Sequence, residues 1–261
     1  MPALYDSIGS NYVATRRADP GIVAQLATFL ALDPGKQYLD VACGTCNYTS
    51  ALAAHGGSWS GVDVSEVMLK TAIDEHPELS LNLGDAIALP YNAGRFDGAI
   101  CTLAIHHFAD LAASFAEVRR VISAGRFVIF TGIAEQMRNY WLWHYFPRMM
   151  ERSTDSMPSS EFIFMALASA GFNHVEIYPY FVEDDLQDLF LYSGKNRPEL
   201  YLNPAVRSNI SSFARLCTDI ELQSGLKRLE QDLASGAFEN VCASFSSSTG
   251  DYAYVIAHAD A

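Results

Sequence analysis

The stretch that decides the fold is Val41-Ala-Cys-Gly-Thr-Cys-Asn-Tyr-Thr49, which follows an apolar run and precedes a helix pattern. Its cysteine pair has two interpretations. A C-x-x-C pair at the start of a helix is typical of a thiol redox site, because the helix N-terminus lowers the pKa of the first thiol. A turn of small residues at this place is typical of a nucleotide site, because it brings backbone N–H groups to the ligand.

Two acidic residues favour the nucleotide interpretation. Asp40 ends the apolar run before the turn, and Asp63 follows the next apolar run, 58–62. An acid about 20 residues beyond such a turn is expected to bind ribose hydroxyls in a βαβ unit. Either acid alone could instead cap a turn or a helix. A zinc site would need two further ligands, and the one other close pair, His106-His107, is adjacent along the backbone, so we predict no metal site.

The composition argues against several classes of protein. The chain has 261 residues, 50% hydrophobic and 18% charged, which suffices for one substantial domain. Its formal net charge of −13 repels nucleic acid and anionic membrane surfaces. No apolar run approaches the roughly 20 residues that span a bilayer, and the start lacks the pattern of a secretory signal. Five scattered cysteines do not indicate a disulfide framework. We therefore expect a cytoplasmic protein with reduced thiols and no nucleic-acid or membrane partner.

Short apolar runs alternate with helix patterns between residues 20 and 132, as in a parallel sheet with crossover helices. The first helix is expected to begin at Pro20 and to end at Asp33-Pro-Gly35, because apolar residues recur between them at helical spacing. The strands expected in this part are 38–42, 58–62, 79–83, 96–103 and 126–131. Further helices are expected after the first strand, from about Ser65, and over 111–122.

The alternation stops after residue 132. Two helical excursions are expected, at about 135–171 and 183–249, with a strand at 175–180 between them and a closing strand at 252–257. The sequence contains no internal repeat and no low-complexity tract. We therefore predict a single α/β domain over residues 1–261, with the two excursions forming a helical cap.

Four motifs occur in order over the first half of the chain. They are Leu39-Asp-Val-Ala-Cys-Gly-Thr-Cys-Asn47, Gly61-Val-Asp-Val-Ser65, Gly84-Asp-Ala86 with Leu89-Pro90, and Phe96-Asp-Gly98 followed by His106-His107. Together they resemble the class I S-adenosylmethionine-dependent methyltransferases, most closely the small-molecule branch called type 11 or UbiE-like. The resemblance implies a Rossmann-like, seven-stranded, mostly parallel sheet whose last strand is antiparallel. It also implies S-adenosylmethionine as cofactor, S-adenosylhomocysteine as product, and a small organic acceptor.

The resemblance also implies roles for individual residues. Asp40, with the backbone around Ala42 and Gly44, would hold the amino-acid end of the cofactor, and Asp63 would accept the ribose hydroxyls. The remaining predicted cofactor contacts are Val64 and Met68 against the adenine, Asp85 with Ala86 at its amino group, Leu103 after the fourth strand, and Tyr12 closing over the site. Met68 is also consistent with ordinary core packing.

The turn departs from the family pattern at two positions. Cys46 and Ala42 stand where the family usually has glycine. The change at Ala42 is interpreted as mild. At Cys46 a side chain would strain the turn if the position needs a positive φ, or it would crowd the cofactor.

Two groups of residues are candidates for the chemistry. His106 and His107 follow the fourth strand, at the edge where ligands bind in open α/β sheets, and a histidine there could take a proton from the acceptor. Packing against Phe108 is the alternative. The aromatic run 140–146 could form a lid over a cation, but helical spacing favours core packing. The pair Arg16-Arg17 is interpreted as solvated surface rather than as a site for an anion.

We therefore predict methyl transfer to a small organic acceptor by in-line displacement. Two alternatives stay open: an S-adenosylmethionine-binding protein without methyl transfer, and a thiol redox or metal-handling protein that uses Cys43 and Cys46. The acidic, aromatic-rich cap hints at a neutral or cationic acceptor. The identity of the acceptor, the atom methylated and the oligomeric state stay open at this stage.

Overall fold

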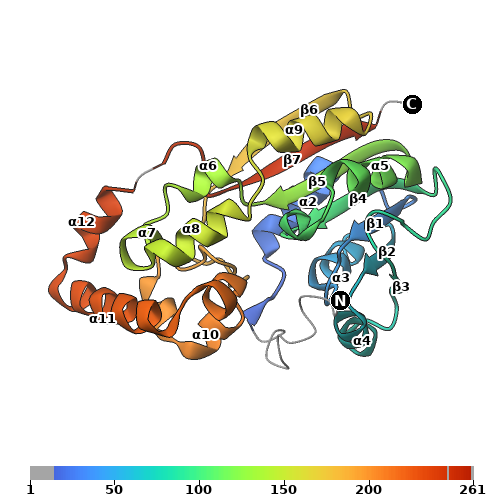
Figure 1. Cartoon of the computed structure of the whole chain (residues 1–261). Helices are drawn as coiled ribbons and strands as arrows, with labels where there is room; N and C mark the ends of the chain where they lie inside the picture. The colour runs from blue at the N-terminus through green and yellow to red at the C-terminus, as the bar shows by residue number, and fades with distance from the viewer. Residues whose placement is uncertain (1–14, 246, 260–261) are drawn as a thin grey trace.

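Seven strands form one sheet in the order β3-β2-β1-β4-β5-β7-β6, and the computed structural model describes residues 15–245 and 247–259 (Figure 1). The strands are Gln37–Val41 (β1), Ser58–Asp63 (β2), Ser80–Leu83 (β3), Phe96–Thr102 (β4), Ile122–Thr131 (β5), His174–Tyr180 (β6) and Tyr252–Ala259 (β7). β1 to β5 pair in parallel, whereas β7 is antiparallel to both β5 and β6. The predicted sheet, including its antiparallel last strand, is confirmed.

Local signals fix the helices around this sheet. α2 (Pro20–Leu30) begins as predicted, because the Asp19 carboxylate accepts the N–H of Gly21 at 2.9 Å and proline occupies the first turn. α2 and α3 (Asn47–Ala53) pack on one face of the sheet, and α5 (Leu111–Val121) packs on the other. α4 (Glu66–Glu75) lies beside β2 and β3, and its N-cap is Ser65.

The start of β5 and the packing of α9 differ from the sequence-based expectation. β5 begins at Ile122, four residues before the predicted start at Arg126, because Gly125 has a φ of 132° and lets the chain pass close to the Asp97 carbonyl. α9 (Ser160–Ser169) lies within the first expected excursion, yet it packs beside α5 on the sheet. The helices that reach beyond the sheet in this excursion are therefore α6 to α8.

The cap forms a second lobe beside the sheet (Figure 1). It contains α6 (Ala134–Met137), α7 (Leu142–Tyr145), α8 (Pro147–Asp155), η3 (Pro198–Leu202), α10 (Pro204–Ser208), η4 (Ser212–Leu216), α11 (Asp219–Ser235) and α12 (Phe238–Ala243). Within the described residues, no helix is long and apolar enough to cross a membrane.

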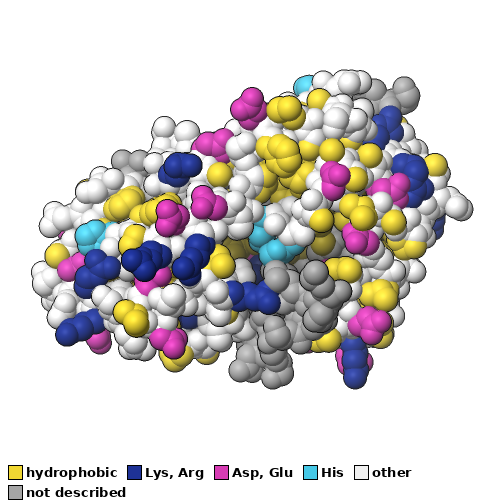
Figure 2. All heavy atoms as spheres, in the orientation of Figure 1, with side chains coloured by type: hydrophobic (Ala, Val, Ile, Leu, Met, Phe, Trp, Pro, Cys, Tyr) yellow, Lys and Arg dark blue, Asp and Glu magenta, His cyan; other side chains and the backbone are white. Residues whose placement is uncertain are grey.

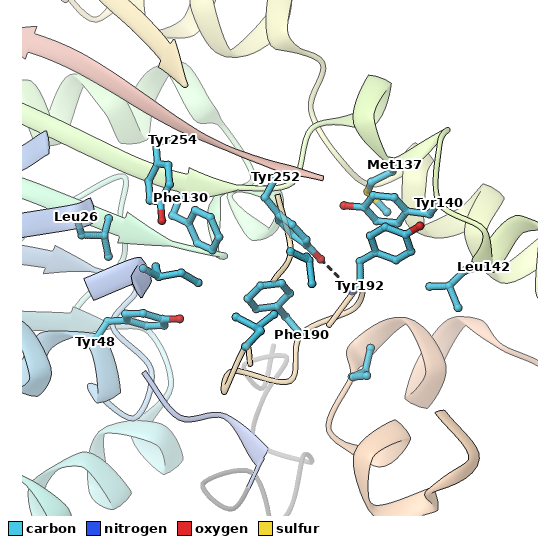
Figure 3. Packing of buried hydrophobic residues seen from close by; sticks show 14 of the residues in the cluster. Leu26, Tyr48, Phe130, Met137, Tyr140, Leu142, Phe190, Tyr192, Tyr252 and Tyr254 are labelled. Carbon is cyan, nitrogen blue, oxygen red and sulfur yellow. Dashed lines mark hydrogen bonds between the residues drawn. The ribbon is translucent and has the colours of Figure 1, made fainter. Parts of the chain in front are cut away.

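One hydrophobic core joins the two lobes. Tyr252 and Phe190 lie between Phe130 of the sheet and Tyr140 of the cap (Figure 3), and all four belong to a single buried cluster. The backbone N–H of Tyr192 donates to the Tyr252 hydroxyl at 3.2 Å. This shared core fixes the cap against the carboxyl ends of the parallel strands.

The aromatic run of the first excursion belongs to this core. Tyr140, Trp141, Tyr145 and Phe146 are at most 2% exposed, and the ring of Tyr140 stacks on that of Tyr192 with centroids 3.7 Å apart. None of these four side chains lines either of the two cavities described below. The core interpretation is therefore confirmed for these four residues, whereas Trp143 is half-buried and His144 is exposed.

Candidate cofactor and acceptor site

Three residues of the turn after β1 have left-handed backbone conformations with positive φ. Ala42, Gly44 and Cys46 have φ angles of 59°, 55° and 61°, and the N–H of Cys46 donates to the Cys43 carbonyl at 2.8 Å. Cys46 thus has the positive φ under which its side chain was expected to strain the turn. The replacement of glycine by Ala42 was interpreted as mild, yet Ala42 lies in the same left-handed region of backbone angles, which is unfavourable for a residue with a side chain. The turn ends at Cys46, the N-cap of α3, which makes no side-chain capping bond.

The two cysteine side chains of the turn are not placed for redox chemistry. Cys46 is fully buried and does not line the first of the two cavities described below, so its side chain does not narrow that cavity. Cys43 packs against Gly61, where a Cβ atom would lie 2.7 Å from the Cys43 sulfur. A hydrogen bond with Cys46, together with burial, raises the pKa of the Cys43 thiol well above its ordinary value. A reactive cysteine needs the opposite shift.

Asp63 lies at the end of β2 and faces the turn. Its carboxylate accepts the N–H of Gly44 at 2.8 Å and the N–H of Ser65 at 2.8 Å. It is not the N-cap of α4, because Ser65 takes that position and accepts the N–H of Met68. These two backbone donors hold the carboxylate of Asp63 at the cavity wall, and carboxylate oxygens are suitable acceptors for hydroxyl groups such as those of ribose.

Asp40 lies behind the turn instead of in the cavity wall. It is 1% exposed, and its Oδ2 accepts a hydrogen bond from the Thr49 hydroxyl at 2.6 Å. Its Oδ1 has no hydrogen-bond partner among the described residues. Burial raises the pKa of Asp40 to about 7, and the bond from Thr49 opposes this rise. A direct contact between Asp40 and the cofactor stays a prediction.

The first cavity, of about 300 Å³, opens at the carboxyl ends of β1, β2 and β4. Eight of the ten predicted cofactor residues line it: Ala42, Gly44, Asp63, Val64, Met68, Asp85, Ala86 and Leu103. Asp40 does not, and Tyr12 lies outside the described residues. Val64 is 60% exposed and Ile87 46% exposed at the cavity. Exposed aliphatic side chains can pack against the face of a flat ring. Ile87 also lines this cavity, although the sequence analysis did not predict it as a site residue.

The sequence-based interpretation of Arg16 is wrong, since its side chain is not solvated surface. The Arg16 side chain is 16% exposed and its Nε lies 2.5 Å from Oδ1 of Asp188, which is itself 1% exposed. The Tyr48 hydroxyl donates to the other oxygen of Asp188 at 3.1 Å. Arg17 is exposed, as expected. No sequence signal distinguishes the two arginines, because the partner of Arg16 lies far along the chain in the segment after β6.

A second cavity, of about 390 Å³, adjoins the first and is lined mainly by the cap. Arg16, Leu103 and His107 line both cavities and therefore mark their junction. The other walls of the second cavity combine apolar residues such as Met137 and Phe190 with several serines and an arginine. In Figure 2, histidine side chains show between the two lobes, and Lys and Arg side chains gather on the cap beside them. Both volumes are typical of small-molecule sites.

The two predicted catalytic histidines form η2 (Ile105–His107), just after β4. Their ring centroids are 3.8 Å apart. Burial, then the neighbouring charges of His107 and Arg16, lowers the pKa of His106 to about 3. Desolvation and the positive charge of Arg215 lower the pKa of His107 as well. Both imidazoles are neutral at pH 7, so each can accept a hydrogen bond but is a weak base.

One cluster elsewhere could hold a metal ion. His174 and Glu176 of β6 and His258 of β7 offer ligand atoms within 4.8 Å of one another. His258 Nε2 lies 2.9 Å from the Glu176 carboxylate, and Arg126 lies opposite His258 on β5, where it adds positive charge. None of these residues lines either cavity. We assign the cluster to a hydrogen bond between His258 and Glu176 that joins β7 to β6.

Known proteins resemble this chain in sequence and in fold. A family model described as a methyltransferase domain matches residues 39–130. The demethylmenaquinone methyltransferase of Corynebacterium kroppenstedtii is 33% identical over 127 residues, 47% of this chain and 55% of that protein. The demethylmenaquinone methyltransferase of Alkalihalophilus pseudofirmus is 28% identical over 180 residues, 58% of this chain and 76% of that protein. The chain thus spans about half the length of the first of these relatives.

A solved structure extends the likeness to the cap. The crystal structure of a candidate methyltransferase from an antibiotic biosynthesis pathway of Anabaena variabilis is 34% identical, with a TM-score of 0.84 over 93% of this chain and 98% of that one. The chain therefore belongs to the class I S-adenosylmethionine-dependent methyltransferases. The methyl donor of this family is S-adenosylmethionine, so the first cavity is the place to expect this cofactor.

Proposed function

We propose that the protein transfers the methyl group of S-adenosylmethionine, bound in the first cavity, to a small organic acceptor bound in the second. The observation that carries this proposal is the junction, where Leu103 and His107 line both cavities. A donor and an acceptor in these two places would meet at that point. No comparable supporting observation favours cofactor binding without methyl transfer or thiol chemistry.

The residues of the first cavity suit the three parts of the cofactor. Asp63 is held by two backbone N–H groups and would accept the ribose hydroxyls. Val64, Met68 and Ile87 offer apolar surface to the adenine. The backbone of Gly44 would contact the amino-acid end of the cofactor. A Cβ atom at this position would meet no atom within 4 Å, so the backbone is open to the cavity.

The cofactor supplies an electrophilic methyl group, and the protein holds the acceptor in position to receive it. Holding an acceptor atom about 3 Å from a reactive carbon accounts for a large part of the rate in such displacements. His107 lies at the junction and, as a neutral imidazole, would orient a donor group of the acceptor. His106 would support it from the second cavity. We propose both as groups that position the acceptor, since their lowered pKa values make them weak general bases.

The lining of the second cavity indicates an acceptor with an apolar body. Met137, Met157 and Phe190 provide an apolar wall that suits the body of a small organic molecule. The curated relatives are named for demethylmenaquinone, and an apolar ring system of that kind is compatible with these walls. We also propose a cytoplasmic location, because the five cysteines are free thiols, as a reducing compartment would keep them.

Calorimetric titration with S-adenosylmethionine and S-adenosylhomocysteine tests the cofactor half of this proposal. The wild-type protein is expected to bind each in a one-to-one complex. Asp63→Ala is expected to bind at least about tenfold more weakly, because hydrogen bonds to a charged group contribute about 1.5–3 kcal/mol each. Asp74→Ala, which removes an exposed carboxylate of α4 outside the cavity, is the matched control. A folded wild-type protein without affinity, or an Asp63→Ala variant with unchanged affinity, would overturn the proposal.

A further inference from the structure

The charge in the second cavity contrasts with that of the whole chain. The protein has a formal net charge of −13, yet among the described residues no Asp or Glu lines the second cavity, whereas Arg16 and Arg215 do. The acidic composition of the cap suggested a neutral or cationic acceptor. The lining of the cavity argues for the opposite charge, because the local field acts on a bound ligand more strongly than the distant net charge.

The two arginines differ in how their charges are compensated. Arg16 is paired with the buried carboxylate of Asp188, so this pair is close to neutral as a unit. Arg215 has no carboxylate within ion-pair distance in the part of the chain that the structure describes. Its positive charge is also one of the causes that lower the pKa of His107. The uncompensated charge of the second cavity is therefore that of Arg215, and its field reaches the junction.

The backbone around Arg215 is arranged to present polar groups to the cavity. The segment η4, Ser212–Leu216, is a π-helical turn, a rare conformation that is frequent at functional sites. It places Ser211, Ser212 and Arg215 on the cavity wall together. Ser212 also shares a hydrogen bond of 2.8 Å with Ser153, another wall residue on α8. A guanidinium beside hydroxyl donors is the chemistry that binds a carboxylate.

We propose that the second cavity binds the acceptor as an amphipathic organic carboxylate, whose charged group pairs with Arg215 and whose apolar body packs on Met137, Met157 and Phe190. This inference rests on the proposed function, because it names the class of molecule that the second cavity takes.

Binding of matched probes tests the inference. Benzoate, 2-naphthoate and decanoate are each compared with the corresponding primary amide, which has nearly the same shape and no charge. Each is titrated calorimetrically into the protein with and without saturating S-adenosylhomocysteine. The wild-type protein is expected to bind at least one carboxylate at least about tenfold more tightly than its amide. Arg215→Gln is expected to lose this preference, and Arg215→Lys to keep part of it, because lysine retains the charge without the planar fork.

Arg138→Gln is the matched control, since it removes an exposed cap arginine that lines neither cavity. It is expected to bind the probes like the wild-type protein. Affinity for S-adenosylhomocysteine is measured in every variant. Because Arg215 does not line the first cavity, an unchanged affinity in Arg215→Gln shows that this variant is folded. A wild-type protein that does not bind S-adenosylhomocysteine would count against the proposed function alone. A wild-type protein that binds no carboxylate in preference to its amide, or an Arg215→Gln variant that keeps the preference, would overturn the inference.

Discussion

Single residues at the carboxyl ends of β1 and β4 adopt conformations that usually require glycine. Ala42, Cys46 and Leu103 have φ angles of 59°, 61° and 53°. A side chain in this region costs roughly 1–2 kcal/mol per residue. Ala42 and Leu103 line the first cavity, whereas the Cys46 side chain is buried in the core. Such strain concentrates at functional sites, and here it shapes the edge where donor and acceptor would meet.

Asp40 should make stability depend on pH. Its folded pKa of about 7 lies above the ordinary value of 3.8, so the folded state binds this proton more tightly than the unfolded state does. The stabilising contribution is complete below about pH 4 and is lost as the pH rises through 7. Between pH 4 and pH 8 we expect the free energy of unfolding of the wild-type protein to fall, relative to Asp40→Asn, by up to about 4 kcal/mol.

Urea denaturation at pH 4, 6 and 8 measures this difference. Asp74→Asn, an exposed carboxylate on α4, serves as the control and should follow the wild-type curve. Parallel pH dependence in wild-type protein and Asp40→Asn would show that Asp40 is not buried as described.

Among the elements, α11 shows how closely the cap helices pack. Gly225 is buried in the middle of α11, and a Cβ atom there would lie 2.3 Å from a ring carbon of Phe146 and 2.6 Å from the Tyr145 carbonyl oxygen. Helix propensity alone would make alanine better by about 1 kcal/mol. Because the added atom would overlap backbone, we expect Gly225→Ala to lower the free energy of unfolding by about 1–3 kcal/mol.

Thermal or urea unfolding checks this prediction, with Ser224→Ala on the exposed face of the same helix as the control. The control should change stability by less than about 0.5 kcal/mol. Affinity for S-adenosylhomocysteine should stay the same in both variants, since neither residue lines the first cavity. A Gly225→Ala variant more stable than the wild type would mean that α11 does not approach α7 and α8 so closely.

The sheet and its crossover helices were predictable from local patterns. Asp19 and Pro20 mark the start of α2 in the sequence itself, and apolar runs mark each buried strand. The role of α9 was not predictable, because its apolar face is the same whether it packs on the sheet or in a cap. The close approach at Gly225 also leaves no local signal, since it depends on Phe146, which lies far away along the chain.

At the scale of the whole molecule, the two adjoining cavities are lined by residues of both the sheet lobe and the cap. The cofactor motifs were predictable because they are contiguous in sequence and occur at the ends of β1 and β2. The second cavity was not predictable, because it combines Arg16 from before α2, His107 from the loop after β4 and Arg215 from the cap. No spacing rule relates these positions; only the folded chain brings them together.

A crystal structure with S-adenosylhomocysteine bound tests the central claim most directly, namely that cofactor and acceptor cavities meet at Leu103 and His107. The account predicts ribose hydroxyls on Asp63, adenine against Val64 and Met68, and the sulfur atom facing the second cavity at the junction. The account would be contradicted by S-adenosylhomocysteine bound outside the first cavity. It would also be contradicted by a sulfur atom that points away from the second cavity, with the cap separating the two cavities.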